Sequence, residues 1–174
     1  MKQTLKSISL ALIMAFASLV LFYLAGARIN TTKSIPVGLY WATDEYVCKG
    51  SYVMFCPPEL PAFLLAKERG YIATGMCPGG YGYMMKRILA AKNDVVRFTD
   101  QGVFVNGTLL PLSKPLSSDL SGRPLPHFRT DAYTLTAEDV LLMSDVSATS
   151  FDGRYYGPVN VAQIRSVIKP IFIW

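Results

Sequence analysis

The sequence predicts a mainly β fold, a small coiled-sheet or barrel-like domain behind one hydrophobic segment, and two observations carry this prediction. The run from Ser7 to Ala27 contains no charged side chain, and about 20 apolar residues suffice to span a bilayer. Beyond Ala27, short β-rich runs alternate with closely spaced Gly, Pro, Asn and Asp residues. The 174 residues contain no repeat and fit one folded domain, which we place at residues 28–174 behind a segment at 1–27.

The N-terminal run has two interpretations. Lys2 and Lys6 precede it, so the positive-inside bias predicts a cytoplasmic N-terminus and a folded part on the far side of the membrane. Ala25-Gly26-Ala27 has the small-x-small form of a signal-peptide cleavage site. The length of the run favours an uncleaved anchor over a cleaved signal segment, and both interpretations place residues 28–174 beyond the membrane.

The charge distribution favours a membrane neighbour over a nucleic acid. The net charge is +5, and the Lys and Arg residues are scattered without a basic run. A mildly basic domain beside a bilayer suits an anionic lipid surface. With 51% hydrophobic residues and a mean hydropathy of +0.30, the chain is more apolar than an average soluble protein, and part of the excess lies in the N-terminal run.

The predicted strands follow one another at short intervals along the folded part. They are expected at 39–41, 51–55, 83–90, 95–98, 103–105, 108–110, 140–143 and within 159–174. The Asn106-Gly107 pair is a strong hairpin signal between the runs 103–105 and 108–110.

Helical character is limited to two places. The segment Pro61–Arg69 predicts a helix that stops at Gly70, and Thr136–Asp139 predicts a single capped helical turn. Two other stretches predict loops because they are rich in Pro, Ser, Gly and polar residues: residues 111–131 and residues 144–157.

The cysteines indicate a disulfide rather than a metal site. There is no Cys-x-x-Cys and only one histidine, so neither a metal nor another cofactor is expected. Cys56 and Cys77 flank the predicted helix, each is followed by Pro, and an exported domain favours their pairing. Pairing of Cys48 in place of Cys56 stays open, and otherwise Cys48 is expected to be a small buried side chain.

Two segments could supply a nucleophile and its base. Ser34 precedes Ile-Pro and a glycine, a sequence that can hold a hydroxyl at the lip of a groove. Lys86 shares a strand face with apolar Met84, Ile88 and Ala90, and burial there would lower its pKa toward working pH. The plainer interpretations are a polar turn after an anchor and an exposed lysine that reaches into water.

A third segment, within residues 144–157, could support the first two. The Ser150 hydroxyl would hold the Lys86 amine, and Asp152 would pair with Arg154 to fix the loop. The plainer interpretation is a polar surface loop whose ion pair has little energetic weight.

Taken together, Ser34-Ile35-Pro36, Lys86-Arg87-Ile88 and the stretch from Ser150 to Gly157 resemble three motifs of one family. This family is the bacterial type I signal (leader) peptidases, which are membrane-bound serine–lysine proteases. The chain resembles most closely their TraF subfamily, encoded with plasmid conjugative transfer systems. The order of the motifs after an N-terminal membrane segment makes the resemblance specific, and it covers most of the exported part.

The resemblance implies a role for each matching residue. Ser34 would attack the scissile carbonyl, Lys86 would be the general base, and Asp152 would be a third essential residue. The Ser34 backbone N–H and the Thr32 hydroxyl would stabilise the oxyanion, with Ser150 and Arg154 as supporting groups.

The resemblance also implies a substrate and a location. The enzyme would be a periplasmic serine endopeptidase that cleaves an extended segment of an exported precursor, the conjugative propilin, with head-to-tail cyclisation as one outcome. Its other partners would be mating-pair formation proteins. The predicted strands 51–55 and 83–88 would form the walls of the peptide groove.

Three alternatives come from different classes. The first is a general type I signal peptidase that removes leader peptides, and the second is a non-catalytic envelope component of the conjugation machinery. Replacements of usual motif residues by Ser144, Val146 and Gly153 support the second. A thiol enzyme using Cys48 is the third. A self-cleaving repressor of the LexA kind is disfavoured by the membrane segment.

Overall fold

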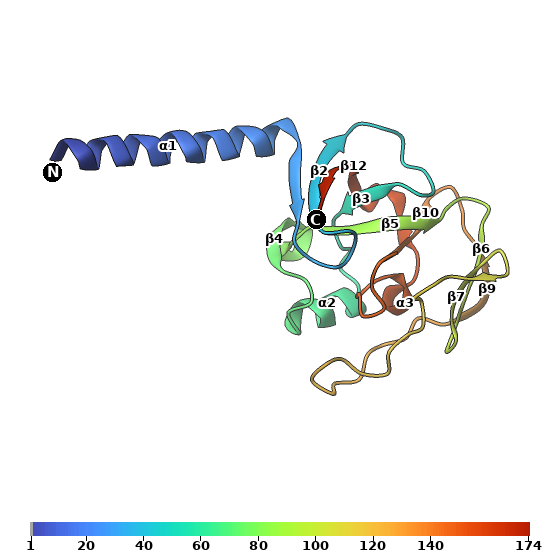
Figure 1. Ribbon diagram of the computed structural model, residues 1–174. Coiled ribbons are helices and arrows are strands. Elements are labelled where there is room, and N and C mark those ends of the chain that lie inside the picture. The colour runs from blue at the N-terminus through green and yellow to red at the C-terminus, as the bar shows by residue number, and fades with distance from the viewer. Residues whose placement is uncertain (1) are drawn as a thin grey trace.

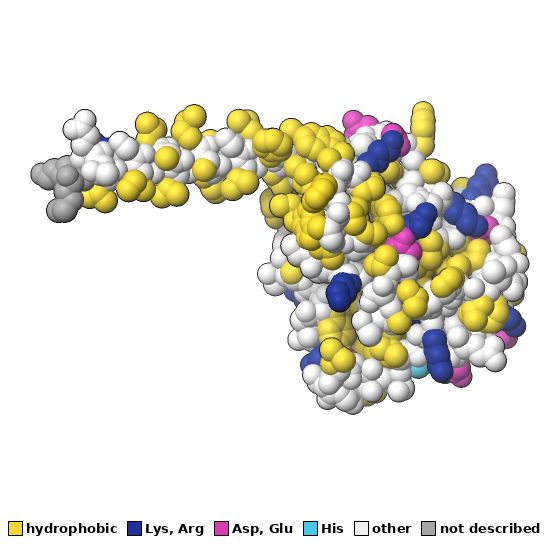
Figure 2. All heavy atoms as spheres, viewed as in Figure 1, with side chains coloured by type: hydrophobic (Ala, Val, Ile, Leu, Met, Phe, Trp, Pro, Cys, Tyr) yellow, Lys and Arg dark blue, Asp and Glu magenta, His cyan; other side chains and the backbone are white. Residues whose placement is uncertain are grey.

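The computed structural model describes residues 2–174 and begins with a long helix, α1, over Lys2–Ala25. Its stretch Gln3–Ala25 reaches a mean hydropathy of 2.4, and none of that stretch is buried in the protein. In Figure 1 the helix projects from the domain as a single rod, and Figure 2 shows apolar side chains along it. Ser7 and Ser18 donate their hydroxyls to carbonyls four residues back, so these polar groups are satisfied within the helix. A helix of this length that is apolar on all sides suits a lipid environment.

The folded domain is built on a seven-stranded antiparallel sheet in the order β1-β2-β12-β3-β5-β10-β11. Its strands are β1 (Ala27–Asn30), β2 (Gly38–Thr43), β3 (Tyr52–Phe55), β5 (Met84–Ala90), β10 (Asp139–Met143), β11 (Val159–Asn160) and β12 (Ile164–Ile173). In this order β5 lies between β3 and β10, near the middle of the sheet. Figure 1 shows α1 joining the domain where β1 enters this sheet.

A second, four-stranded sheet has the order β8-β7-β6-β9. Its strands are β6 (Val95–Thr99), β7 (Gly102–Val105), β8 (Thr108–Leu109) and β9 (Thr130–Thr134). The remaining elements are β4 (Thr74–Cys77), α2 (Pro61–Glu68), α3 (Gly153–Tyr156), and the short 3-10 helices η1 (Pro78–Gly80) and η2 (Val161–Gln163).

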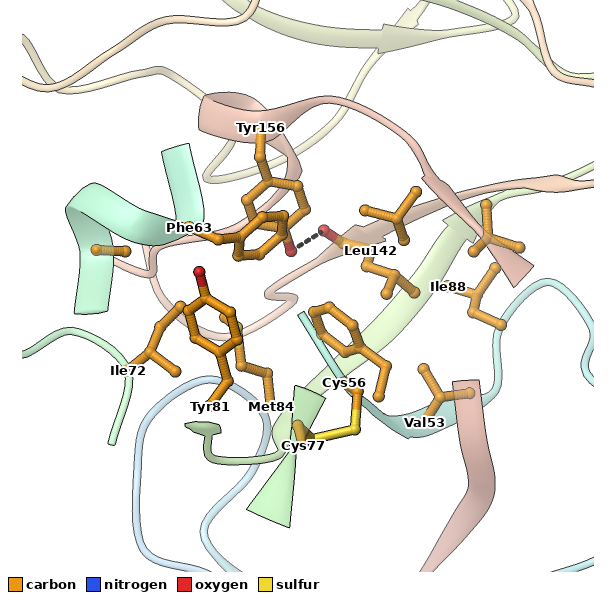
Figure 3. Packing of buried hydrophobic residues seen from close by; sticks show 14 of the residues in the cluster. Val53, Cys56, Phe63, Ile72, Cys77, Tyr81, Met84, Ile88, Leu142 and Tyr156 are labelled. Carbon is orange, nitrogen blue, oxygen red and sulfur yellow. Dashed lines mark hydrogen bonds between the residues drawn. A yellow bond between two sulfur atoms is a disulfide. The ribbon is translucent and has the colours of Figure 1, made fainter. Parts of the chain in front are cut away.

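The main core lies between the large sheet and helices α2 and α3. Figure 3 shows the rings of Phe63, Tyr81 and Tyr156 packed beside side chains from β3, β5 and β10. The structure contains the disulfide between Cys56 and Cys77 that the sequence favoured, with the two Cα atoms 5.5 Å apart. It joins the end of β3 to the end of β4 at the edge of this core.

A second core holds the small sheet against the large one. Residues of β6 and β7 pack there with Ala90 of β5 and with Leu141 and Met143 of β10. The two sheets therefore form one domain, and the alternating side chains of β10 are buried on both faces.

The mainly β prediction is confirmed, and so are the helix after Pro61 and the hairpins around Asn106-Gly107. Helix α2 ends close to Gly70, which adopts a φ of +76° as a left-handed C-terminal residue does. The strand from Met84 to Ala90 buries alternate residues, as the predicted face requires.

Four expectations about local structure were wrong. The predicted polar loop 144–157 ends in the short, buried helix α3. Thr136–Asp139 is a turn rather than a helical turn, because the Asp139 carboxylate accepts from the Thr136 amide and hydroxyl and β10 starts there. The predicted loop 111–131 ends early, since Thr130–Thr134 forms β9 on the open edge of β6. Cys48 is exposed rather than buried and lies near the Ser51 hydroxyl at a surface turn.

Candidate active site

Ser34 lies in the loop between β1 and β2, and this loop is folded around the side chain of Asn30. The Asn30 amide donates to the carbonyls of Thr32, Ile35 and Pro36, at 2.7, 2.9 and 3.1 Å. Its Oδ1 accepts from the Thr32 N–H at 3.2 Å and lies 3.0 Å from the Thr32 hydroxyl. Asn30 is only 4% exposed, so one buried amide fixes the backbone on both sides of Ser34.

A tyrosine and a glycine fix the exit of the same loop. The buried Tyr40 donates its hydroxyl to the Pro36 carbonyl at 2.6 Å, and Ile35 packs in the same small core. Gly38 leaves room for the neighbouring strand, because a Cβ there would stand 2.3 Å from the Phe172 carbonyl oxygen. Ser34 itself stays half-buried and lines a pocket.

Lys86 lies in the middle of β5 and is 1% exposed, so its amine is in the interior. Burial lowers the pKa of Lys86 to about 8, an effect that Asp152 opposes and Arg154 reinforces. The amine donates to the Ser150 hydroxyl at 3.0 Å. A neutral amine is therefore accessible at mildly alkaline pH, which is what a general base needs.

The loop that carries Ser150 is held by a buried ion pair. Asp152 and Arg154 are both fully buried at their side chains, and Arg154 Nε donates to Asp152 Oδ1 at 2.8 Å. Asp152 also accepts from the Ser144 N–H at 3.0 Å. The Arg154 guanidinium donates further to the Ala148 carbonyl at 2.6 Å, so both ends of the loop are tied to one charge pair.

These separate segments meet at one pocket of about 250 Å³. Ser34, Thr32, Asn30 and Lys86 all line it, together with Tyr71–Ala73 and Tyr83–Met85. Within residues 2–174 no hydrogen bond joins the Lys86 amine to the Ser34 hydroxyl. Instead Lys86 donates to Ser150, and the Thr32 and Ser34 hydroxyl oxygens lie 3.2 Å apart. The pocket thus combines a hydroxyl and a low-pKa amine, the components of nucleophilic acyl transfer.

One wall of the pocket differs from the prediction. The residues 83–86 contribute as expected, but the other wall comes from residues 29–34 and 71–73 rather than from 51–55. The reason is the strand order, since β3 pairs with β5 along its opposite edge and fills the interior of the sheet.

Asn30 and Tyr40 are the two site-building residues that the sequence did not single out. An asparagine at the end of a strand, two residues before a Thr-Lys-Ser turn, is the local signal that could have indicated Asn30. Tyr40 carries no comparable signal, because its contact with Pro36 arises only when β2 is paired in the sheet.

Comparison with known proteins shows which family the chain belongs to. Residues 1–174 match the family described as "Signal peptidase, peptidase S26". The chain belongs to this family. Membership makes the protein a peptidase by descent, and the candidate pocket is the place where this chain brings a hydroxyl and a buried amine together.

Within the signal peptidase family, the chain is similar to proteins of plasmid transfer. It is 58% identical over 178 residues to a "Plasmid transfer protein TraF" from Escherichia coli, with 100% of both chains covered. A second E. coli protein of the same name is 66% identical over 152 residues, covering 87% of this chain and 86% of the relative. The "Conjugal transfer protein TraF" of Agrobacterium tumefaciens (strain 15955) is 33% identical, covering 84% and 82%. The resemblance to the TraF subfamily is confirmed.

A solved structure is also similar. The crystal structure of a signal peptidase I from Enterococcus faecalis V583 has a TM-score of 0.41 and 17% identity, covering 73% of this chain and 100% of that one.

Proposed function

We propose that this protein is a serine endopeptidase in which Ser34 is the nucleophile and Lys86 the general base, and that it processes an exported precursor during plasmid conjugative transfer. The observation that carries the proposal is the buried Lys86 amine, whose pKa falls to about 8 at the pocket that Ser34 also lines. A lysine with an ordinary pKa of about 10.4 would be protonated at working pH and could not accept a proton.

In the first step, Ser34 Oγ attacks the carbonyl carbon of the scissile bond while its proton passes to the neutral Lys86 amine. The Ser34 N–H and the Thr32 hydroxyl stabilise the oxyanion, and one such donor contributes roughly 2.7–4 kcal/mol to the transition state. The protonated Lys86 then gives its proton to the leaving amine, which leaves an ester on Ser34 and a neutral lysine. Movement of the amine from Ser150 toward Ser34 precedes this step, because the two groups are not hydrogen-bonded in the free protein.

Asn30 supports a switch in the Thr32 hydroxyl. The Asn30 amide nitrogen faces three carbonyls, which fixes the orientation of the amide and turns its acceptor Oδ1 toward Thr32. The single Thr32 hydroxyl proton serves this oxygen in the free protein. Rotation of that proton toward the oxyanion costs little, because Oδ1 keeps the Thr32 N–H. The Thr32 hydroxyl therefore donates to Asn30 in the free protein and to the oxyanion when negative charge develops there.

The peptide would lie along β5. Ile88 exchanges backbone hydrogen bonds with Gly50 and Ser51 on the β3 side, and backbone groups alternate along a strand. The N–H and C=O of Met85 therefore point to the opposite edge, where pairing with β10 begins only at Arg87. This open edge can add one extended strand of substrate beside Lys86.

The precursor is proposed to be a conjugative pilin, an assignment supported by the plasmid and conjugal transfer names of the relatives. Hydrolysis needs water at the Ser34 ester, and cyclisation needs the pilin's own N-terminus there. A tethered amine competes well with water because its effective concentration is high. The two products differ in mass by one water.

The site is proposed to face the periplasm. Helix α1 is apolar enough to span the membrane, and Lys2 and Lys6 favour a cytoplasmic N-terminus. Retention of α1 would place the pocket close to the outer surface of that membrane, since β1 begins directly after the helix and leads into the Ser34 loop. Basic side chains of the domain would then meet anionic lipid.

The test is a matched set of variants assayed on purified propilin and on a conjugation donor strain. Ser34→Ala should abolish cleavage and plasmid transfer, whereas Ser147→Ala, at a half-buried serine of the 144–157 loop, should leave cleavage within about threefold. Mass spectrometry of the product separates a linear from a cyclic peptide. Full transfer by Ser34→Ala would make the protein a structural component, and cleavage of unrelated leader peptides with no preference for propilin would make it a general signal peptidase.

A further inference from the structure

A second cavity of about 470 Å³ lies beside the pocket of Ser34 and Lys86. Tyr71 lines both cavities, and the second is also lined by Thr149 and Phe151, the two neighbours of Ser150. Since Ser150 accepts from the Lys86 amine, the two cavities lie on either side of one short stretch of chain. The proposed mechanism does not use the second cavity.

The wall of this cavity nearest the core is aromatic. The rings of Phe151 and Tyr155 are stacked, with centroids 5.6 Å apart and an angle of 4° between them. Tyr71 adds a third ring, 5.9 Å from Phe151. A flat wall of this kind suits an aliphatic or aromatic side chain, which gains contact area there without needing polar partners.

The opposite wall is a loop that is ordered by its own hydrogen bonds and tied to the Tyr71 hydroxyl. Asp119 accepts from the backbone N–H groups of Ser121 and Arg123, both at 2.9 Å, and from the Arg123 guanidinium at 2.7 Å. Asp119 also accepts from the Tyr71 hydroxyl, and Arg69 donates to the Pro124 carbonyl at 2.7 Å. The loop is therefore ordered without collapsing onto the rings, and the cavity is preformed.

The loop carries an apolar side chain that the fold leaves without cover. Leu120 at its tip is fully exposed, with a relative exposure of 102%, and it lines the cavity together with Leu116 and Leu125. Figure 1 shows this loop on the side of the domain away from the point where α1 joins it. A polypeptide that leaves the catalytic pocket in the direction away from the membrane would reach this loop.

We propose that the second cavity binds an apolar side chain of the same precursor polypeptide, several residues from the scissile bond, with Leu120 closing over that side chain. This rests on the proposed function and adds a specificity site to it. Long precursors would then be favoured over short peptides, because only a long chain occupies both cavities at once.

The experiment compares a short fluorogenic peptide, limited to the residues around the scissile bond, with longer peptides that carry one Phe at successive positions of the extension. The extension that places Phe in the cavity should lower KM about tenfold relative to the same peptide with Ala, at unchanged kcat. In Leu120→Asp the Phe peptide should no longer have a lower KM than the Ala peptide. Cleavage of the short peptide should stay as in the unaltered protein. Leu120 is outside the folded core, so this variant tests binding without a loss of folding.

Leu112→Asp is the matched control, because Leu112 is exposed in the same long loop but does not line the cavity. It should retain the preference for the Phe peptide. The same peptides are also titrated by fluorescence anisotropy onto Ser34→Ala, which measures the cavity without cleavage. An equal affinity for Phe and Ala peptides at every position would overturn the inference, whereas a Phe preference with no cleavage by the unaltered protein would overturn only the proposed function.

Discussion

Two ion pairs of the same kind differ in what surrounds them. The pair of Asp152 and Arg154 lies beneath the large sheet with both side chains fully buried, and it ties together the loop next to Lys86. The pair of Asp100 and Arg129 lies on the small sheet, with side chains 68% and 58% exposed. The buried pair fixes the loop beside Lys86 but carries a desolvation penalty. The exposed pair contributes little to the free energy of folding.

The ionisable groups that are costly to bury are concentrated beside the candidate pocket. Lys86, Asp152 and Arg154 are all ionisable, all buried, and all beside the candidate pocket. The core of the small sheet is apolar apart from the buried Ser113, whose hydroxyl accepts from the Val103 N–H, and among residues 2–174 it holds no buried ionisable group and no candidate residue. We therefore expect substitutions beneath the large sheet to have large effects, and matched substitutions on the small sheet to have small ones.

The largest effect is expected for Arg154→Ala. Removing the guanidinium leaves the Asp152 carboxylate buried without its cation, and breaking one partner of a buried pair costs about 3–5 kcal/mol. Urea denaturation measures the free energy of unfolding. The matched change, Arg129→Ala, should cost less than about 1 kcal/mol. Equal losses for the two variants would remove the distinction between the regions.

Lys86→Met should stabilise the protein while abolishing cleavage. The folded pKa of about 8 lies below the unfolded value, so the unfolded chain binds more protons between these values and the lysine destabilises the fold below pH 8. The gain should reach about 3 kcal/mol below pH 8 and vanish above about pH 10.5. Lys49→Met, at a half-exposed amine, is the control and should change stability by less than about 1 kcal/mol. Destabilisation by Lys86→Met at neutral pH would contradict this account.

Asn30→Ala should weaken both the Ser34 loop and the reaction. The carbonyls of Thr32 and Ile35 lose the Asn30 donor, whereas the Pro36 carbonyl keeps the Tyr40 hydroxyl. One unsatisfied buried group costs about 1–3 kcal/mol. Because the backbone around Ser34 loosens, kcat should fall more than KM rises. Asn160→Ala, which removes an exposed side-chain bond to the Ala162 N–H, should leave kcat unchanged.

The smallest effect is expected at Cys48, which is exposed and outside the pocket. Cys48→Ala, or treatment with a thiol-blocking reagent, should leave the cleavage rate within about twofold. Loss of activity on blocking would instead favour a mechanism with Cys48 as the nucleophile and contradict the role of Lys86 as general base.

Local patterns predicted the parts of this fold that depend on neighbours in sequence. Alternation along Met84–Ala90 predicted the buried face, and Asn106-Gly107 predicted a hairpin. Strands such as β9 were missed, because Thr130–Thr134 is mostly exposed and becomes a strand only by pairing with β6. The same limit applies to the site, since the contact of Lys86 with Ser150 spans 64 residues and was only one of two interpretations of the 144–157 segment.

A direct titration of the Lys86 amine tests whether its pKa is low enough for a neutral fraction to be present near the pH where the enzyme works. The protein would be labelled with 13Cε-lysine, and the Lys86 signal would be assigned from its absence in Lys86→Met. The account predicts a midpoint near pH 8 for that signal. A midpoint above about pH 10, as for a lysine in water, would contradict it.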